Sequence, residues 1–172
     1  RSGNTREALK KSLENLGLDY VDLYLIHWPA EGYVEAYLEM EKLQKEGLTR
    51  SIGVSNFRKS HLQNLLSKVH IVPSINQIET NPQMVDEETI QYCKENKIGV
   101  EAWSPLGSGA CLNNPKIQEI ANKYQKSSAQ IILRWLLQKG IVILPKSVHE
   151  NRIKENIDLF NFVLENEDVE LI

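Results

Sequence analysis

The chain is poor in cysteine and methionine, and it has no excess of charge of one sign. Its 172 residues include two cysteines and two methionines, with 20 basic and 23 acidic side chains and a formal net charge of −3 at pH 7. Cys93 and Cys111 form no Cys-x-x-Cys motif and have no histidines at metal-ligand spacing. No disulfide framework and no metal site are therefore predicted, and both thiols are expected to be reduced. The interspersed charges exclude a basic face that would bind nucleic acid or an anionic membrane.

Long apolar segments are missing as well. No run approaches the roughly 20 residues of a membrane helix, and the N-terminal residues do not have the pattern of a signal peptide. A cytoplasmic protein without a membrane or nucleic-acid partner is therefore expected. The length suits one domain with a sizeable core and is too short for two ordinary domains, so residues 1–172 are predicted to form a single domain.

What the sequence does contain is a regular alternation of helix and strand patterns. Nearly unbroken apolar runs are typical of parallel strands buried on both faces, whereas apolar residues at helical spacing predict amphipathic helices. Gly17 provides a stop signal for the first helix. The predicted strands cover residues 20–27, 51–55, 73–79, 99–104 and 141–145. The predicted helices cover residues 4–16, 33–46, 58–68, 86–96, 115–124, 127–139 and 147–158.

Two helix starts have a capping-box pattern, in which a hydroxyl residue is followed three positions later by Glu or Gln. Ser127 with Gln130 predicts one box, and Ser147 with Glu150 predicts the other. A helix between successive strands implies a parallel sheet with right-handed crossovers, which occurs both in doubly wound sheets and in (β/α)8 barrels. The pattern alone leaves both folds open. No Gly-x-Gly-x-x-Gly sequence follows a strand, so the Rossmann fingerprint is missing.

Residues able to do chemistry gather where the predicted strands end, which is where α/β proteins bind ligands. Pro29 terminates the first strand and leaves His27 at its carboxyl end. This histidine could act as a general acid, donate a hydrogen bond to a substrate oxygen, or simply be a packed polar residue. Because parallel strands present these ends on one face, a set of residues is expected within about 10 Å of His27. The set consists of Trp28, Asn56, Gln77 and Trp103.

Five strand-end segments, taken in order, resemble those of the aldo-keto reductases, which are NAD(P)H-dependent (β/α)8 barrels. The segments are His27-Trp28-Pro29, Ser55-Asn56-Phe57, Asn76-Gln77-Ile78-Glu79, Trp103-Ser104-Pro105-Leu106-Gly107-Ser108-Gly109 and Leu144-Pro145-Lys146-Ser147-Val148. The resemblance covers nearly the whole chain, including residues 47–57 and 129–135. It implies a TIM barrel to which this chain supplies about five βα units. Five strands cannot close a barrel of eight, so an incomplete barrel with two unpaired sheet edges is expected.

The resemblance also implies a nicotinamide cofactor. A nicotinamide ring needs a flat partner and hydrogen bonds to its carboxamide. Trp103 offers the flat face, and Ser55, Asn56 and Gln77 offer donors and acceptors. The small, hydroxyl-bearing loop over residues 104–109 would let backbone N–H groups approach a pyrophosphate. The alternatives are that Trp103 fills the core and that the loop is an ordinary surface turn.

Cationic residues near the last predicted helix indicate which nicotinamide cofactor is bound. Lys146, Ser147 and Arg152 place two cations and a hydroxyl where a helix start already favours anions. The resemblance assigns them to the 2′-phosphate of NADPH and Asn156 to the adenine, so NADPH is predicted over NADH. The alternative is a solvated helix start with incidental bases. The predicted cofactor contacts are Ser55, Asn56, Gln77, Trp103, Ser104, Pro105, Leu106, Ser108, Lys146, Ser147, Val148, Arg152, Glu155 and Asn156.

The family's catalytic set comprises an Asp, a Tyr acid, a Lys that lowers the Tyr pKa, and a His. Only the histidine maps onto this chain, at His27, which with Trp28 is expected to contact the substrate. Tyr20 and Tyr24 lie inside the first predicted strand, and Tyr33 and Tyr37 lie in the following helix, so none of them replaces the acid. The intact enzyme is predicted to be a monomer that reduces an aldehyde or ketone to an alcohol without a metal.

Three interpretations follow for the 172 residues. The chain is a portion of an NADPH-dependent reductase, a module that binds NADPH without turnover, or an inactive, truncated half-barrel. Residues 1–172 alone are expected to show no carbonyl reductase activity, because protonation of the carbonyl oxygen without a positioned acid loses about 10²–10⁴-fold in rate. Small aldehydes, sugars, keto acids and prostanoids all stay open as substrates.

Overall fold

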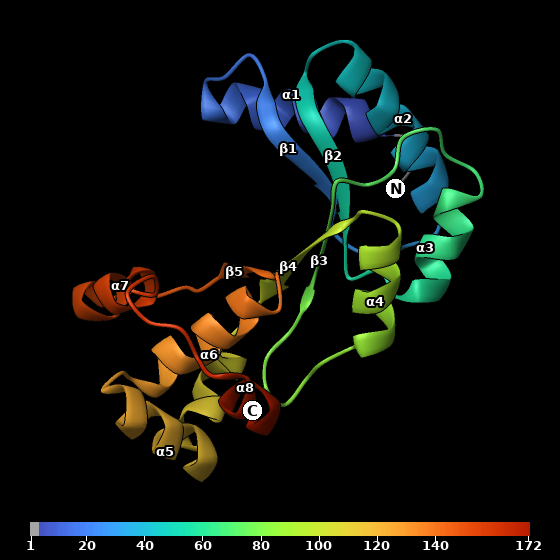
Figure 1. Ribbon diagram of the computed structural model, residues 1–172. Coiled ribbons are helices and arrows are strands. Elements are labelled where there is room, and N and C mark those ends of the chain that lie inside the picture. The colour runs from blue at the N-terminus through green and yellow to red at the C-terminus, as the bar shows by residue number, and fades with distance from the viewer. Residues whose placement is uncertain (1–3) are drawn as a thin grey trace. The chain divides into compact units, whose positions relative to one another are not determined.

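The computed structural model describes residues 4–172 and consists of alternating strands and helices (Figure 1). The predicted strands and helices are all present, with small shifts at their ends. The short 3₁₀ helix η2 and the last helix α8 were not among the predictions. In chain order the elements are α1 (Thr5–Leu16), β1 (Val21–Ile26), α2 (Tyr33–Lys45), β2 (Thr49–Ser55), α3 (Lys59–Leu66), β3 (Ile75–Glu79), α4 (Glu87–Glu95), β4 (Gly99–Trp103), η2 (Gly107–Asn113), α5 (Pro115–Tyr124), α6 (Ser128–Gln138), β5 (Val142–Leu144), α7 (Glu150–Ile157) and α8 (Asn166–Leu171).

The sheet has the strand order β1-β2-β3-β4-β5, which follows the chain. Its pairings are parallel, with Leu25 opposite Gly53, Val54 opposite Asn76, and Trp103 opposite Leu144. A doubly wound sheet reverses its strand order at a switch point, and no such reversal occurs in the described chain. The structure therefore confirms the partial (β/α) barrel.

Strands β1 and β5 form the two ends of this strand order, as the count of βα units predicted. The expectation that the first strand is buried on both faces is wrong. The residues of β1 are half-buried or exposed, whereas most of those of β2 are buried. The difference arises because an edge strand has a neighbouring strand on one side only.

Contacts group the chain into two compact units. The first contains residues 1–77 and 87–99, and the second contains residues 78–86 and 100–172. In the first unit, Leu9 and Leu13 of α1 lie one helical turn apart and pack with Leu43 of α2, together with the half-buried Val21 and Tyr24. Each fully buried leucine contributes about 2 kcal/mol by removal from water. The expectation of a single domain is not tested by this grouping and stays a prediction.

The end of α1 and the interior of β2 each show a local requirement for glycine. Gly17 has φ +66° and ends α1, as predicted, by donating its N–H to the carbonyl of Glu14. Gly53 lies inside β2, where a Cβ atom would be 2.6 Å from the carbonyl oxygen of Ile75. Only a residue without a side chain lets β2 and β3 approach this closely.

The core of the second unit is built around α6, most of whose residues are buried. Its N-terminal capping box is confirmed: the Gln130 N–H donates to Ser127 Oγ at 3.3 Å, and the Ser127 N–H donates to Gln130 Oε1 at 3.0 Å. The predicted box of Ser147 with Glu150 is wrong. Helix α7 begins at Glu150 after His149, and Ser147 Oγ accepts instead from the His149 N–H at 3.1 Å. Ser147 is two residues too early to reach the N–H groups of the first turn.

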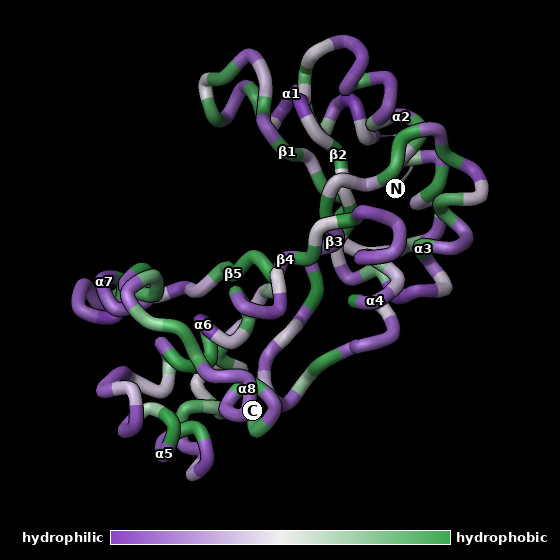
Figure 2. Tube along the Cα trace, in the orientation of Figure 1, coloured by the Kyte–Doolittle hydropathy of each residue, from purple (hydrophilic) through white to green (hydrophobic). Residues whose placement is uncertain are grey.

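Hydrophobic and hydrophilic residues are interleaved along the helices, as Figure 2 shows on the Cα trace. In the part of the chain from residue 4 onward, no helix combines the length and apolar character needed to cross a membrane. The same residues include no group of three or more His, Cys, Asp or Glu side chains placed to hold a metal ion. Both cysteines are buried thiols.

Candidate functional site

His27 follows β1 at its carboxyl end and is exposed. Its backbone carbonyl accepts a hydrogen bond from Asn56 Nδ2 at 2.9 Å. The imidazole ring lies 6.0 Å from the ring of Trp28, measured between centroids, and 57% of Trp28 is exposed. A histidine and a large apolar surface thus stand side by side at the end of this strand.

The residues that follow β2 are tied to the end of β3. Ser55 Oγ and the Asn56 N–H both donate to the carbonyl oxygen of Gln77, each at 2.8 Å. Asn56 has φ +62°, a left-handed conformation that asparagine tolerates better than most residues. Its side-chain amide also donates to Ser55 Oγ at 3.2 Å. Three predicted cofactor residues and His27 are therefore linked in one hydrogen-bond network, and all four belong to the first unit.

The second unit contains a pocket of about 550 Å³. Such a volume is within the usual range for small-molecule and cofactor sites. The pocket is formed by the segments that follow β4 and β5, including part of η2, by the start of α6 and by one side of α7. Its lining comprises Ser104, Pro105, Leu106, Ser108, Gly109, Leu112, Ser127, Ser128, Ala129, Leu144, Pro145, Lys146, Ser147, Arg152, Glu155 and Asn156.

Most of the predicted cofactor residues of the second unit lie in this lining. Trp103 and Val148 do not: Trp103 is half-buried with its carbonyl accepting the Thr80 N–H at 3.4 Å, and Val148 is 74% exposed. Trp103 belongs to the second unit, so its expected proximity to His27 stays a prediction. The start of α6 was not predicted to take part, although the capping box at Ser127 marked a helix N-terminus there.

The loop after β4 has an unusual backbone. Ser104 and Ser108 have φ values of +51° and +53°, which non-glycine residues rarely adopt and which cluster at functional sites. The Ser104 carbonyl accepts hydrogen bonds from the Gly107 N–H at 2.9 Å and from Asn81 Nδ2 at 3.3 Å. Asn81 thus supports this loop, and sequence reasoning did not single it out.

The nearby Cys111 is buried, and burial raises the pKa of its thiol, so the neutral thiol is favoured over a nucleophilic thiolate.

The charges at the pocket favour an anionic ligand. Lys146 and Arg152 contribute two cations to its lining, against the single carboxylate of Glu155. Ser127 and Ser128 add the N-terminal end of α6, which carries a partial positive charge. Together with the serine hydroxyls, this arrangement can bind a phosphate and a neighbouring polar group.

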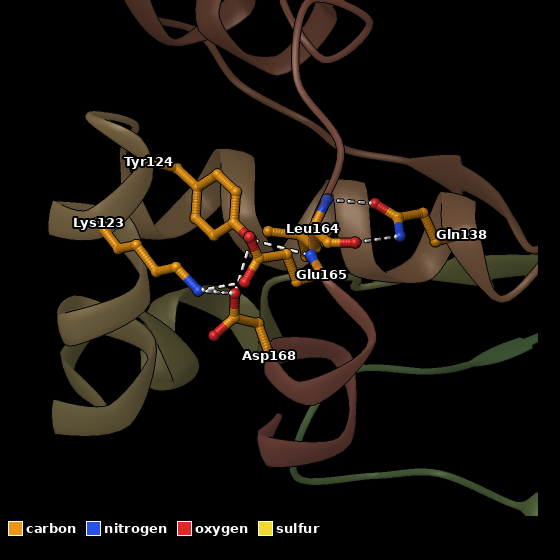
Figure 3. Close-up of polar contacts among 6 residues, drawn as sticks. All are labelled: Lys123, Tyr124, Gln138, Leu164, Glu165 and Asp168. Atoms are coloured by element: carbon orange, nitrogen blue, oxygen red, sulfur yellow. Dashed lines mark hydrogen bonds and ion pairs between the residues drawn. The ribbon is translucent and has the colours of Figure 1, made fainter.

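A further polar cluster holds the C-terminal helix to the rest of the second unit (Figure 3). Asp168 Oδ2 accepts from Tyr124 Oη at 2.6 Å and from Lys123 Nζ at 2.8 Å. The hydrogen bond from Lys123, together with that from Tyr124, lowers the pKa of Asp168. Gln138 pairs with both backbone groups of Leu164, at 2.8 and 3.0 Å. Since these groups bind one another within the fold, we regard the cluster as structural.

The sequential parallel sheet, with helices between its strands and polar loops after them, defines a partial (β/α)-barrel protein. A family model described as "Aldo/keto reductase family" matches residues 1–172. The chain belongs to the aldo/keto reductase family, as its motifs predicted.

Individual relatives agree. The chain is 50% identical over 169 residues to the glyoxal reductase of Bacillus subtilis (strain 168), covering 98% of this chain and 61% of that protein. It is 46% identical over 169 residues to the methylglyoxal reductase DkgA of Escherichia coli (strain K12), covering 95% of this chain and 62% of the relative. A crystal structure of a Bombyx mori aldo-keto reductase in complex with NADP has a TM-score of 0.93 and 40% identity, with 99% of this chain and 62% of that chain covered. The chain thus spans about three fifths of the length of these relatives.

Proposed function

We propose that this chain carries the catalytic histidine and most of the cofactor site of an NADPH-dependent reductase that converts a small aldehyde or ketone to an alcohol. The observation that carries the proposal is the pocket of about 550 Å³ with two cations and several hydroxyls in its lining. Membership of the aldo/keto reductase family and the similarity to a structure containing NADP support it.

The pocket residues fit the phosphorylated end of NADPH. Lys146 and Arg152 would bind the 2′-phosphate, because a guanidinium and an ammonium together match its charge and its several acceptor oxygens. Ser147, Glu155 and Asn156 would contact the adenosine. The loop over residues 104–109 would supply hydroxyls and backbone N–H groups to the pyrophosphate. Val148, which is exposed, is proposed as an outer contact of the adenosine.

The nicotinamide end would be held by other residues. Ser55, Asn56 and Gln77 would bind the carboxamide, and Trp103 would stack on the ring. NADPH, when bound, supplies the hydride that reduces the carbonyl carbon. The network that connects the turn after β2 to Gln77 holds the first three residues in place, so little ordering would be needed on binding.

His27 would orient the substrate by donating a hydrogen bond to its carbonyl oxygen, and Trp28 would form an apolar wall of the substrate site. Two of the described tyrosines are engaged elsewhere: Tyr33 Oη accepts from Asn64 Nδ2, and Tyr20 Oη accepts from Arg50. Tyr37 is fully buried, and its burial raises the pKa of the phenol. A chain limited to residues 1–172 would therefore bind NADPH without efficient proton transfer, which keeps a non-catalytic NADPH-binding protein as the second candidate.

The proposed substrates are small reactive aldehydes, since two relatives are named for the reduction of glyoxal and methylglyoxal. We propose a cytoplasmic, monomeric enzyme, in keeping with a small diffusible substrate. Titration of the chain with NADPH and NADH, followed by tryptophan fluorescence, tests the cofactor assignment. We expect NADPH to bind more tightly by about tenfold or more, corresponding to one charge-assisted contact. Equal affinities would contradict the assignment.

A further inference from the structure

We propose that Asn76 is a positioning residue for the candidate active site: its side chain fixes the turn after β2 and so holds the Asn56 amide against the His27 carbonyl. This inference rests on the proposed function for its effect on NADPH binding. Asn76 lies in β3, is 0% exposed, and was predicted only as part of a strand-end segment.

Asn76 binds both backbone groups of one residue. Its Nδ2 donates to the carbonyl of Phe57 at 2.8 Å, and its Oδ1 accepts from the Phe57 N–H at 3.4 Å. The amide side chain therefore acts as an additional peptide unit at the point where β2 has ended and its own ladder to β3 stops. Phe57 itself is 0% exposed, so water cannot replace these contacts.

The next residue of β3 holds the other half of the same turn. The Gln77 carbonyl accepts from Ser55 Oγ and from the Asn56 N–H. Asn56, with φ +62°, is thus fixed on its N-terminal side by Gln77 and on its C-terminal side by Asn76 through Phe57. A left-handed residue persists where its surroundings hold it from both sides.

The identity of the side chain matters because a buried polar group at a strand position costs free energy unless it is paired. Valine or isoleucine would fill a buried strand position at less cost. The end of the asparagine side chain carries both a donor and an acceptor. The buried carbonyl of Phe57 needs the donor, and the buried N–H of Phe57 needs the acceptor. An aspartate would place an oxygen against the Phe57 carbonyl unless it were protonated. Asn76 Nδ2 also lies 3.7 Å from Cys93 Sγ, a weak acceptor that does not replace the Phe57 contact.

The consequence reaches His27 in two steps. If Phe57 is released, Asn56 can leave its left-handed conformation, and its Nδ2 then loses the bond to the His27 carbonyl. The effect should be confined to the turn and to ligand binding. Core hydrogen bonds such as the one from the Leu62 N–H to the Arg58 carbonyl in α3 should be less affected.

The test compares Asn76→Leu, which keeps the size but removes the donor and acceptor, with Thr89→Ala in the full chain. Thr89 is a matched control, because it is 1% exposed and its Oγ1 accepts from the Lys59 N–H at 3.0 Å, just beyond the same turn. Amide hydrogen exchange is measured at Asn56 and at Leu62. In Asn76→Leu we expect protection at Asn56 to fall by about tenfold or more relative to Leu62. In Thr89→Ala we expect protection at Asn56 and protection at Leu62 to fall by the same factor.

NADPH affinity provides the second measurement. We expect Asn76→Leu to weaken binding by about tenfold, with little change in Thr89→Ala. Unchanged relative protection at Asn56 in Asn76→Leu would overturn the proposal. If the unsubstituted chain binds no NADPH, the proposed function fails, and the exchange data by themselves still decide whether Asn76 fixes the turn.

The variant Asn76→Asp provides a test that does not depend on the leucine variant folding well. Burial and the facing carbonyl raise the pKa of an introduced carboxyl group. The protonated form can donate to the Phe57 carbonyl as the amide does, so protection at Asn56 should be present below this raised pKa and be lost as the pH rises above it. Equal protection below and above the pKa of the introduced carboxyl would also overturn the proposal.

Discussion

The two units of the molecule organise their polar groups in different ways. In the first unit, the strand-end residues bind one another and the main chain: Asn56 holds the His27 carbonyl, and Ser55 holds that of Gln77. In the second unit, Lys146 and Arg152 line an open pocket of about 550 Å³ instead. The comparison indicates that the strand-end side chains of the first unit are held in place by hydrogen bonds to one another and to the main chain, whereas the pocket of the second unit is defined by its charge and volume.

The largest expected effect concerns turnover and tests whether the hydrogen-bonded residues of the first unit and the pocket of the second are sufficient for chemistry. Residues 1–172, purified and mixed with NADPH and methylglyoxal, should consume NADPH at the background rate. General acid catalysis by a positioned group contributes about 10²–10⁴-fold, and the role proposed for His27 is to orient the carbonyl oxygen, not to supply that acid. The measurement is the aldehyde-dependent loss of NADPH absorbance. A monomeric preparation whose rate rises in proportion to added aldehyde would contradict this prediction and require a proton donor among the described residues.

The next effect tests the charged pocket. Lys146→Ala or Arg152→Ala should weaken NADPH binding by about 1.5–3 kcal/mol for each charge-assisted contact, with a much smaller effect on NADH. Fluorescence titration of both nucleotides measures the difference. Lys154→Ala is a control on α7, the helix that carries Arg152, because Lys154 Nζ pairs with Glu150 and Lys154 is not in the pocket lining. Equal losses for NADPH and NADH would show that the two cations are structural.

A third prediction tests the close packing of β2 against β3 in the first unit. Gly53→Ala should lower the free energy of unfolding by about 1–3 kcal/mol through overpacking, because a Cβ atom would lie 2.6 Å from the Ile75 carbonyl oxygen and 2.8 Å from Leu25 Cδ2. Urea unfolding measures the change. The neighbouring Ser51→Ala, at a half-buried position of β2, should differ by less than about 0.5 kcal/mol. If the two substitutions cost the same, close approach of β2 and β3 is not the reason for glycine.

The smallest effect tests the cluster that holds α8. Asp168→Asn should destabilise the protein by about 1–2 kcal/mol near neutral pH, since Lys123 and Tyr124 lose a charged acceptor. The folded pKa of Asp168 is lowered, so its contribution is present above the unfolded pKa of about 3.9 and is lost as the pH falls through the folded value. The difference in the free energy of unfolding between Asp168→Asn and the unsubstituted protein should therefore disappear in acid.

Urea unfolding near neutral pH and in acid, below the folded pKa of Asp168, checks this fourth prediction. Glu165→Gln is the matched control, because the Glu165 side chain is 66% exposed and also pairs with Lys123. An exposed pair contributes little, so this variant should change stability by less than about 1 kcal/mol. A constant gap between Asp168→Asn and the unsubstituted protein across the pH range would show that the aspartate acts through packing alone.

Local signals were predicted well because their causes lie within a few residues. The stop at Gly17 depends on one left-handed residue, and the box of Ser127 with Gln130 depends on two side chains within a single helical turn. The box of Ser147 with Glu150 has the same pattern and did not form, because α7 begins three residues after Ser147. A capping pattern indicates where a helix can start, and the packing of the loop before it decides whether it does.

Features that depend on distant residues were not predicted. Helix α8 is six residues long. It is attached to α6 by, among other contacts, the hydrogen bond that Trp135 Nε1 donates to the Val169 carbonyl at 3.1 Å. The support of Asn76 for Phe57 and of Asn81 for Ser104 joins residues about twenty positions apart. An asparagine in a strand pattern looks the same whether it faces solvent or fixes a turn.

The sequence by itself determined the alternation of strands and helices, the family, and the residue types at each strand end, because periodicity and short motifs are properties of neighbouring residues. Only the tertiary structure decided that β1 is a half-buried edge. It also decided that the start of α6 joins Lys146 and Arg152 in one pocket, and that Asn76 reaches both backbone groups of Phe57. These outcomes depend on which elements pack together, since burial and hydrogen-bond geometry are set by contacts between segments far apart in the chain.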